Sequence, residues 1–233
     1  MSPVTAVIQA RLGSSRFPGK MLATLGGHTL LEWVVSRVSH AASLNRVVVA
    51  TTQDSVDDRL VTACNGLGVE VVRGSTNDVL ARFADALRGD PAQVVVRICA
   101  DNPFVDPECI DVVVRELAES GCDYAFNHRP LGDCNYPDGF GAEAMTRTMF
   151  DSLATQALSA QQREHVTLAI VDGSLPARMH ACRAEGPLKR RELRFDVDTP
   201  DHLATLENFV RTKSLDFDTT ASEIIEQFDQ FQS

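Results

Sequence analysis

The chain has 233 residues, of which 44% are hydrophobic and 23% are charged, and this composition is typical of one globular domain with a full core. Its formal net charge of −10 argues against binding to nucleic acid or to an anionic membrane surface, because both need a basic protein surface. No apolar stretch approaches the ~20 residues of a membrane span, and residues 1–10 lack the cationic start of a signal peptide, which predicts a cytoplasmic protein.

The first half of the chain alternates apolar, β-branched runs with segments of helical spacing. We expect strands at 4–10, 46–52, 69–74 and 94–100, and helices at 30–38, 56–67, 79–87 and 107–120. This alternation predicts β-α-β units and a largely parallel sheet that is covered on both faces.

The second half has a looser pattern. Residues 124–145 are rich in Gly, Pro, Asn and Asp, which predicts a loop with short strands. A helix is expected at 164–171, strands at 177–182 and 193–197, and a last amphipathic helix at 219–229. Thr199 is the expected N-cap of a further helix, because Pro200 suits the first helical position and Asp201 suits the first turn.

The six cysteines, at positions 64, 99, 109, 122, 134 and 182, are widely scattered. They form no C-x-x-C pair and no Cys/His cluster at zinc spacing, so we expect reduced thiols in the core or at its edge.

Three cations follow the first expected strand. Arg11, Arg16 and Lys20 lie on a loop of glycines and serines, and ligands of open parallel sheets bind at the carboxyl ends of the strands. Guanidinium and ammonium groups with exposed backbone N–H groups suit a polyphosphate. The loop is not a P-loop, because five residues separate Gly13 from Gly19 and Met21 replaces the Ser or Thr. Ion pairs with the acidic body of the protein are the structural alternative.

Aspartates follow two other expected strands. Asp101 and Asp198 are each typical of a cap or turn when taken alone, but a triphosphate on the cationic loop brings Mg²⁺, which takes one or two carboxylates. Asp196 lies two residues before Asp198 on an expected strand, so both should face the same way. Arg97, inside an apolar strand, needs either an acidic partner or a ligand.

These segments together resemble the cytidylyltransferase family, the enzymes that make CMP-sugars from CTP, and most closely its spore-coat polysaccharide branch. The first loop matches I-x-A-R-x-x-S-x-R-x-P-x-K from Ile8 to Lys20, and the segments VRGSTNDVLARF, VRICADNPFVDP, YPDGFGAE, REHVT and LRFDVDTPDHL follow in the order of the branch. The resemblance implies a Rossmann-like, GT-A-like nucleotidyltransferase fold: a three-layer α/β/α domain over 1–233 with a mostly parallel central sheet and a small β-rich insertion. It also implies CTP as co-substrate, Mg²⁺ or Mn²⁺, pyrophosphate as product, and commonly a homodimer.

The resemblance also implies roles for individual residues. The nucleotide would be bound by Ala10, Arg11, Gly13, Ser14, Arg16, Lys20, Arg73, Ser75 and Asp101. Asp101 and Asp198 would bind the metal, while Arg16, Lys20 and Asp196 would be catalytic. The insertion at roughly 123–182 would serve acceptor binding and dimerisation, and the acceptor residues would be Tyr136, Glu143, Arg163, Glu164 and His165.

The chain departs from the branch in one motif. The branch usually reads Y-P-R-G-L-D-V-E where this chain has Y-P-D-G-F-G-A-E, so Asp138 replaces a base and Gly141 removes an acid. The acceptor is therefore open between a sugar acid and a small carboxylate or phosphonate. Two other hypotheses stand beside the cytidylyltransferase: a glycosyltransferase that uses Asp196-Val197-Asp198 as a D-x-D motif, and a nucleotide-binding module without activity.

Overall fold

The computed structural model describes residues 2–128 and 131–232, so Arg129 and Pro130 of the expected insertion lie outside the described residues. The strands are β1 (Val4–Gln9), β2 (Thr24–Leu25), β3 (His28–Thr29), β4 (Arg46–Thr52), β5 (Glu70–Gly74), β6 (Val94–Cys99), β7 (Tyr124–Phe126), β8 (Glu143–Thr146) and β9 (Met179–Ala181). The helices are α1 (Leu30–Ser39), α2 (Asp58–Gly66), α3 (Val79–Ala86), α4 (Pro107–Ser120), α5 (Arg147–Thr155), α6 (Ala160–Glu164), α7 (Leu168–Val171), α8 (Pro200–Lys213) and α9 (Ala221–Gln232). Short 3-10 turns are η1 (Lys20–Leu22), η2 (Ser55–Asp57) and η3 (Gly186–Leu188).

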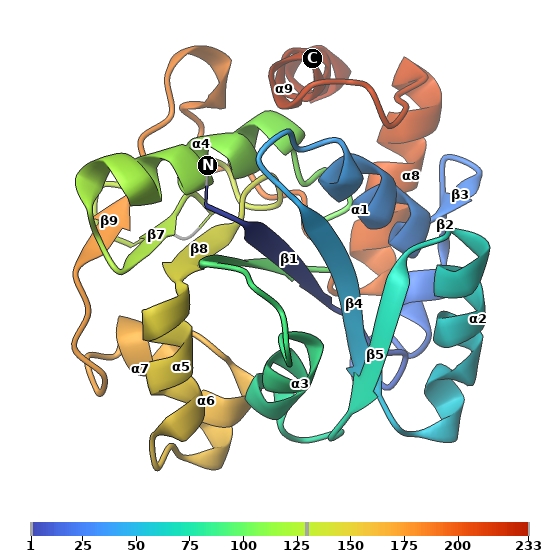
Figure 1. The fold of residues 1–233 in the computed structure, drawn as a ribbon. Helices are drawn as coiled ribbons and strands as arrows, with labels where there is room; N and C mark the ends of the chain where they lie inside the picture. Colours follow the sequence, from blue (N-terminus) through green and yellow to red (C-terminus); the bar gives the residue numbers. More distant parts are fainter. Residues whose placement is uncertain (1, 129–130, 233) are drawn as a thin grey trace.

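A seven-stranded sheet forms the centre of the protein, in the order β5-β4-β1-β6-β8-β7-β9 (Figure 1). The four strands expected in the first half, β1, β4, β5 and β6, pair in parallel. β8 runs antiparallel to both of its neighbours, β6 and β7, and β9 pairs in parallel with β7 at the edge. The sheet is thus mostly parallel, as predicted, and β8 adds an antiparallel strand that the sequence analysis did not predict.

Helices cover both faces of this sheet (Figure 1). α1 and α4 pack against each other on one side, whereas α3, α5 and α6 gather on the other. β1 is a continuous buried run, as expected for a central parallel strand that helices cover on both faces. A cluster of aromatic rings under α8 and α9, including Phe104, Phe195 and Phe228, extends the core towards the C-terminus. None of the helices described is both long enough and apolar enough to cross a membrane.

Local signals explain most helix boundaries. The Thr199 side chain accepts from His202 N, and Pro200 opens α8 as expected. At α1 the Thr29 hydroxyl caps the helix while Glu32 returns to the Thr29 N–H, forming a capping box. All six cysteines are free; five of them are buried and Cys99 is half-buried, which agrees with the expected positions in the core or at its edge.

Two expected elements are wrong. The helix predicted at 164–171 is broken, because α6 ends at Glu164 and α7 begins only at Leu168. The turn between them buries Val166 completely and leaves Glu164 and His165 exposed. The strand predicted at 193–197 is an extended segment with a single isolated bridge, from Arg194 to Asp138. Phe195 and Val197 are completely buried by packing, so the apolar alternation of this segment indicated burial rather than sheet pairing.

Candidate active site

The loop after β1 is held in place at both of its ends. Leu12 N donates to a carboxylate oxygen of Asp57 at 2.7 Å, and Asp57 is completely buried. Gly19 N donates to Leu12 O at 2.8 Å, and Gly19 has a positive φ of 76°, which favours glycine at that position. The loop therefore presents its cations from a fixed backbone at the carboxyl end of the sheet.

Two of these cations contact two carboxylates from distant parts of the chain. Lys20 Nζ lies 3.2 Å from Asp101 Oδ2 and 3.7 Å from Asp198 Oδ1. Arg16 Nη1 lies 2.7 Å from Asp198 Oδ2. The Lys20 side chain is only 12% exposed, so its ammonium is held by these carboxylates and by the carbonyl of Val197 at 2.9 Å.

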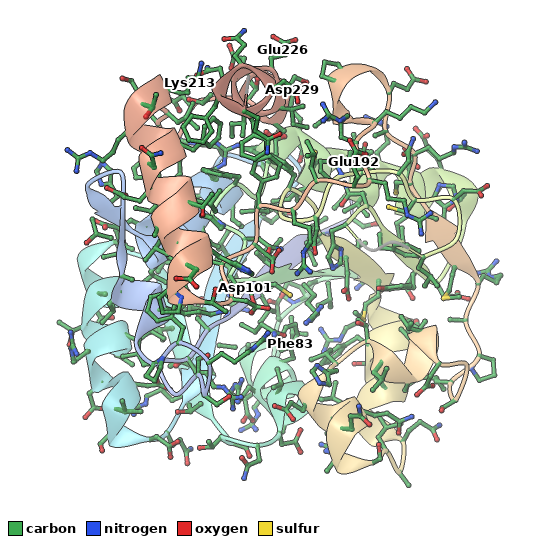
Figure 2. The ribbon with its side chains drawn as sticks, turned by 180° about the vertical axis from the view of Figure 1, so that it is seen from behind. Phe83, Asp101, Glu192, Lys213, Glu226 and Asp229 are labelled. Carbon is green, nitrogen blue, oxygen red and sulfur yellow. The ribbon has the colours of Figure 1, made fainter. Side chains whose placement is uncertain are left out.

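The backbone brings the two aspartates together. Asp101 follows β6, which is the neighbour of β1, and Asp198 immediately precedes the cap of α8. Val197 N donates to Asp101 O at 2.8 Å, which fixes the two segments side by side. Figure 2 shows Asp101 beside one end of α8, with Lys213 labelled at the opposite end.

A cavity of about 300 Å³ opens over these groups. Nine of the predicted residues line it: Ala10, Arg11, Ser14, Arg16, Lys20, Asp101, Glu164, His165 and Asp198. Gln9, Ser15, Met21, Val79, Arg82 and Ala100 line it as well and were not predicted. The predicted cationic loop, the aspartates and part of the acceptor segment thus share one polar cavity.

Arg82 is the most informative residue that the sequence reasoning missed. It is buried, and its Nη1 donates to Ser75 O at 2.6 Å and to Thr76 O at 3.2 Å. Arg11 donates to the same Thr76 carbonyl at 3.3 Å, so two guanidinium groups lie side by side. Burial and the neighbouring Arg11 lower the pKa of Arg82. The signal was in the sequence, since Arg82 falls on the apolar stripe of α3 with Val79.

Arg73 and Ser75 do not line the cavity. The Arg73 guanidinium pairs with Asp58 at 2.7 Å and donates to the carbonyls of Thr52 and Asp54. Ser75 contributes its backbone carbonyl to Arg82 rather than a side chain to the cavity. The arrangement gives no support to a contact between Arg73 and cytidine.

Asp196 and Asp198 form ion pairs with different partners, although Phe195 and Val197 are buried and both aspartates are half-buried, as strand alternation predicts. Arg194 holds both oxygens of Asp196, at 3.0 and 2.9 Å, while Asp198 turns to Arg16 and Lys20. Both carboxylates also raise the pKa of Arg194, so the two aspartates lie in one acidic neighbourhood. Asp138 is next to this pair, and burial and the charge of Asp196 raise the pKa of Asp138.

The remaining acceptor candidates lie deeper or further out. Glu143 is completely buried and binds Arg97 Nη1 at 2.7 Å and His128 Nε2 at 3.1 Å. Arg97 therefore has the acidic partner that its buried position required, and its Nε also donates to Gln9 at the cavity wall. Tyr136 is also buried.

Two residues of the REHVT segment form ion pairs with other parts of the chain. Arg163 Nε pairs with Asp78 Oδ2 at 2.5 Å, and Glu164 Oε1 lies 3.4 Å from Arg11 Nη2. Glu164 and His165 line the cavity, whereas Arg163 does not.

The glycine at 141 is a packing requirement of this chain. A Cβ built on Gly141 would lie 2.2 Å from Asn127 Oδ1 and 2.7 Å from Asn127 O. The Asn127 amide is itself engaged, because it donates to Cys109 O and accepts from Ala142 N. The acid that the related branch carries at this place therefore does not fit here without moving a buried hydrogen-bonding group.

The donor chemistry beside Lys20 suits a divalent metal ion. Asp101 and Asp198 provide carboxylate oxygens at the cavity wall, and Mg²⁺ typically takes one or two carboxylates together with water and substrate phosphate oxygens. The positive charges of Lys20 and Arg16 balance the two carboxylates, and all four side chains line the same cavity. These residues fit a metal-bound triphosphate better than they fit a metal cage made of protein alone.

This protein has a mostly parallel sheet with a cationic loop and two aspartates at the carboxyl ends of its strands. These features together indicate a nucleotidyltransferase. The family model described as cytidylyltransferase matches residues 5–227, and the chain therefore belongs to the cytidylyltransferase family. This confirms the predicted family and the predicted kind of enzyme.

Individual relatives agree with this assignment. The spore coat polysaccharide biosynthesis protein SpsF of Bacillus subtilis is 34% identical over 230 residues, which covers 97% of this chain and 93% of the relative. The structure of a cytidylyltransferase from Leptospira borgpetersenii superposes with a TM-score of 0.89 at 25% identity and covers 100% of this chain and 96% of the other. A CMP:2-keto-3-deoxy-manno-octonic acid synthetase solved with CTP shares the fold, with a TM-score of 0.69 at 20% identity over 92% of this chain and 100% of the other.

Proposed function

We propose that this enzyme transfers CMP from CTP to a small acidic acceptor and releases pyrophosphate. The observation that carries the proposal is the position of Lys20, whose ammonium contacts both Asp101 and Asp198 at the wall of a cavity that also holds Arg11 and Arg16. Residues 20, 101 and 198 come from three separate segments, and their convergence is what a triphosphate with its metal requires.

The proposed chemistry is an in-line displacement. An acceptor oxygen attacks the α-phosphorus of CTP and loses its proton, the new O–P bond forms, and the bond to the pyrophosphate oxygen breaks. Lys20 and Arg16 bind the phosphates and stabilise the charge that grows on the leaving pyrophosphate, while Arg11 and Arg82, which also line the cavity, bind further anionic or carbonyl oxygens of the substrates. A bound Mg²⁺ or Mn²⁺, held by Asp101 and Asp198, would add positive charge to the phosphates.

The acceptor class rests on the relatives and on the charge of the site. The octonic acid synthetase named above acts on a sugar acid, and SpsF is named for polysaccharide biosynthesis. Within residues 123–182 we propose that Glu164 and His165 contact the acceptor directly, because both line the cavity. Tyr136, Glu143 and Arg163 would shape the wall behind it, and Asp196 would act from beside Asp138. Since Asp138 and Gly141 differ from the related branch, a small carboxylate or phosphonate is the second acceptor class.

A screen of pyrophosphate release tests the proposal. Purified enzyme with Mg²⁺ is incubated with each of four nucleoside triphosphates and with sugar acids, amino sugars, small carboxylates or small phosphonates. Pyrophosphate formed only with CTP and one acidic acceptor class supports the proposal. A glycosyltransferase would instead consume a sugar nucleotide without pyrophosphate, and a silent module would show thermal stabilisation by CTP and no product with any acceptor.

We also propose that the enzyme is a homodimer, as the family resemblance implies. Light scattering with size-exclusion chromatography tests this, because a dimer has twice the 25.4 kDa of one chain. A mass of one chain at all concentrations would contradict the proposal.

A further inference from the structure

Three metal-ligating side chains converge at the edge of the sheet. They come from α4 and from the chain at β9, two elements that lie side by side (Figure 1). His180 lies on β9 and Cys182 follows it, two residues on, so both point to the same side of the strand. Cys182 N donates to Phe126 O at 2.9 Å, which continues the pairing with β7. Glu116 reaches them from α4, which packs against β9.

The ligand atoms are already close to one another. The imidazole nitrogen, the thiol sulfur and a carboxylate oxygen all lie within 4.8 Å of one another. Glu116 Oε2 and His180 Nε2 are 2.8 Å apart. The Cys182 thiol is completely buried and is hydrogen-bonded to Glu116, and burial and this carboxylate raise the pKa of the thiol.

We propose that Glu116, His180 and Cys182 form a binding site for Zn²⁺, separate from the nucleotide site. Zinc binds thiolate, imidazole and carboxylate together, at bond lengths of ~2.0–2.3 Å, and three protein ligands leave one position for water. A thiolate and a carboxylate balance the two charges of the ion. Binding converts the Cys182 thiol to a thiolate, and its proton leaves to solvent.

Geometry supports a functional site over a simple surface ion pair. The side chains of Glu116 and His180 are 25% and 37% exposed, which gives an ion access from solvent, while the sulfur is buried beneath them. The ligands come from one helix and one strand of the sheet, so their backbones are fixed by the fold. A zinc ion here would tie α4 to the edge of the sheet.

Sequence patterns missed this site for a physical reason. Zinc motifs are recognised by two close pairs of ligands along the chain, such as C-x-x-C. Here one pair is H-x-C on a strand, and the third ligand lies 64 residues earlier on a helix. Only the packing of α4 on β9 brings them together.

Cobalt titration of the full-length enzyme tests the proposal, with excess Mg²⁺ present to occupy the nucleotide site. A tetrahedral Co²⁺–thiolate site absorbs strongly at roughly 300–400 nm, and carboxylates alone do not produce this band. We expect the band in the wild type, its loss in Cys182→Ser, and about tenfold or weaker binding in His180→Gln and Glu116→Gln. The controls Cys64→Ser and His40→Gln should bind cobalt as the wild type does.

Thermal unfolding provides a second readout that does not depend on colour. At a hundredfold excess of Zn²⁺ over its dissociation constant, the Tm of the wild type should rise by roughly 5–10 °C, whereas the His180→Gln and Glu116→Gln variants should show little shift at the same concentration. Because the His180 and Glu116 side chains are partly exposed, we expect the His180→Gln and Glu116→Gln variants to fold. They therefore test zinc binding even if Cys182→Ser folds poorly. The absence of a thiolate band in the wild type, or an equal band in Cys182→Ser, would overturn the proposal.

Discussion

Replacing Lys20 with alanine removes an ammonium that contacts two carboxylates at the wall of the nucleotide cavity. If this ammonium stabilises charge on the departing pyrophosphate, its loss removes a charge-assisted hydrogen bond of ~1.5–3 kcal/mol from the transition state. Because each 1.36 kcal/mol changes a rate tenfold, kcat should fall by about 10- to 150-fold. The KM for CTP should change much less, since the contact is stronger in the transition state than in the ground state.

Steady-state pyrophosphate release at varied CTP gives both constants. The control is Lys213→Ala, because Lys213 lies at the far end of α8 from Asp101 (Figure 2). Circular dichroism and thermal unfolding of Lys20→Ala check that Asp101 and Asp198 tolerate the loss of their partner. An unchanged kcat with a raised KM would show uniform binding and refute the assigned role of Lys20.

Two further variants test buried packing and a buried ion pair outside the nucleotide cavity. Gly141→Ala should lower the free energy of unfolding by about 1–3 kcal/mol in urea, because its Cβ would lie 2.2 Å from Asn127 Oδ1, whereas Gly66→Ala should not, since nothing lies within 4 Å of a Cβ there. Equal stability of the two variants would contradict the close approach. Arg37→Met should cost about 3–5 kcal/mol in the same assay, because it leaves the buried carboxylate of Asp106, now 3.2 Å from Arg37, without its charge partner. A loss below about 1 kcal/mol would show that Asp106 is satisfied by its backbone donors alone.

Much of the fold followed from the sequence because its parallel strands are continuous buried runs. β1, β4, β5 and β6 were predicted to within one residue at each end, since runs of β-branched residues between helical segments have few other structural solutions. The extended segment at 193–197 has a similar apolar pattern but pairs only once, at Arg194. A hydrophobic pattern predicts which residues are buried. Whether a segment pairs as a strand also depends on whether the fold places another strand beside it.

The site was predictable where motif and topology coincide. Arg11, Lys20 and Asp101 follow adjacent strands, so their meeting was a consequence of the parallel sheet. Arg82 was missed because it lies on helix α3 and does not follow a strand. Its only signal in the sequence was a charged residue on the apolar face of that helix. The different ion-pair partners of Asp196 and Asp198 depend on where Arg194 and Arg16 lie in the fold, which sequence spacing does not determine.

The central claim is that the cationic loop and the two aspartates act together on one metal-bound triphosphate. Calorimetric titration of CTP with Mg²⁺ and with a chelator in its place tests this most directly, in the wild type, in Asp198→Asn and in the control Asp201→Asn. We predict that Mg²⁺ tightens CTP binding about tenfold or more in the wild type and in Asp201→Asn, and about twofold or less in Asp198→Asn. An equal effect of Mg²⁺ in all three proteins, or no binding of CTP to the wild type, would contradict the account.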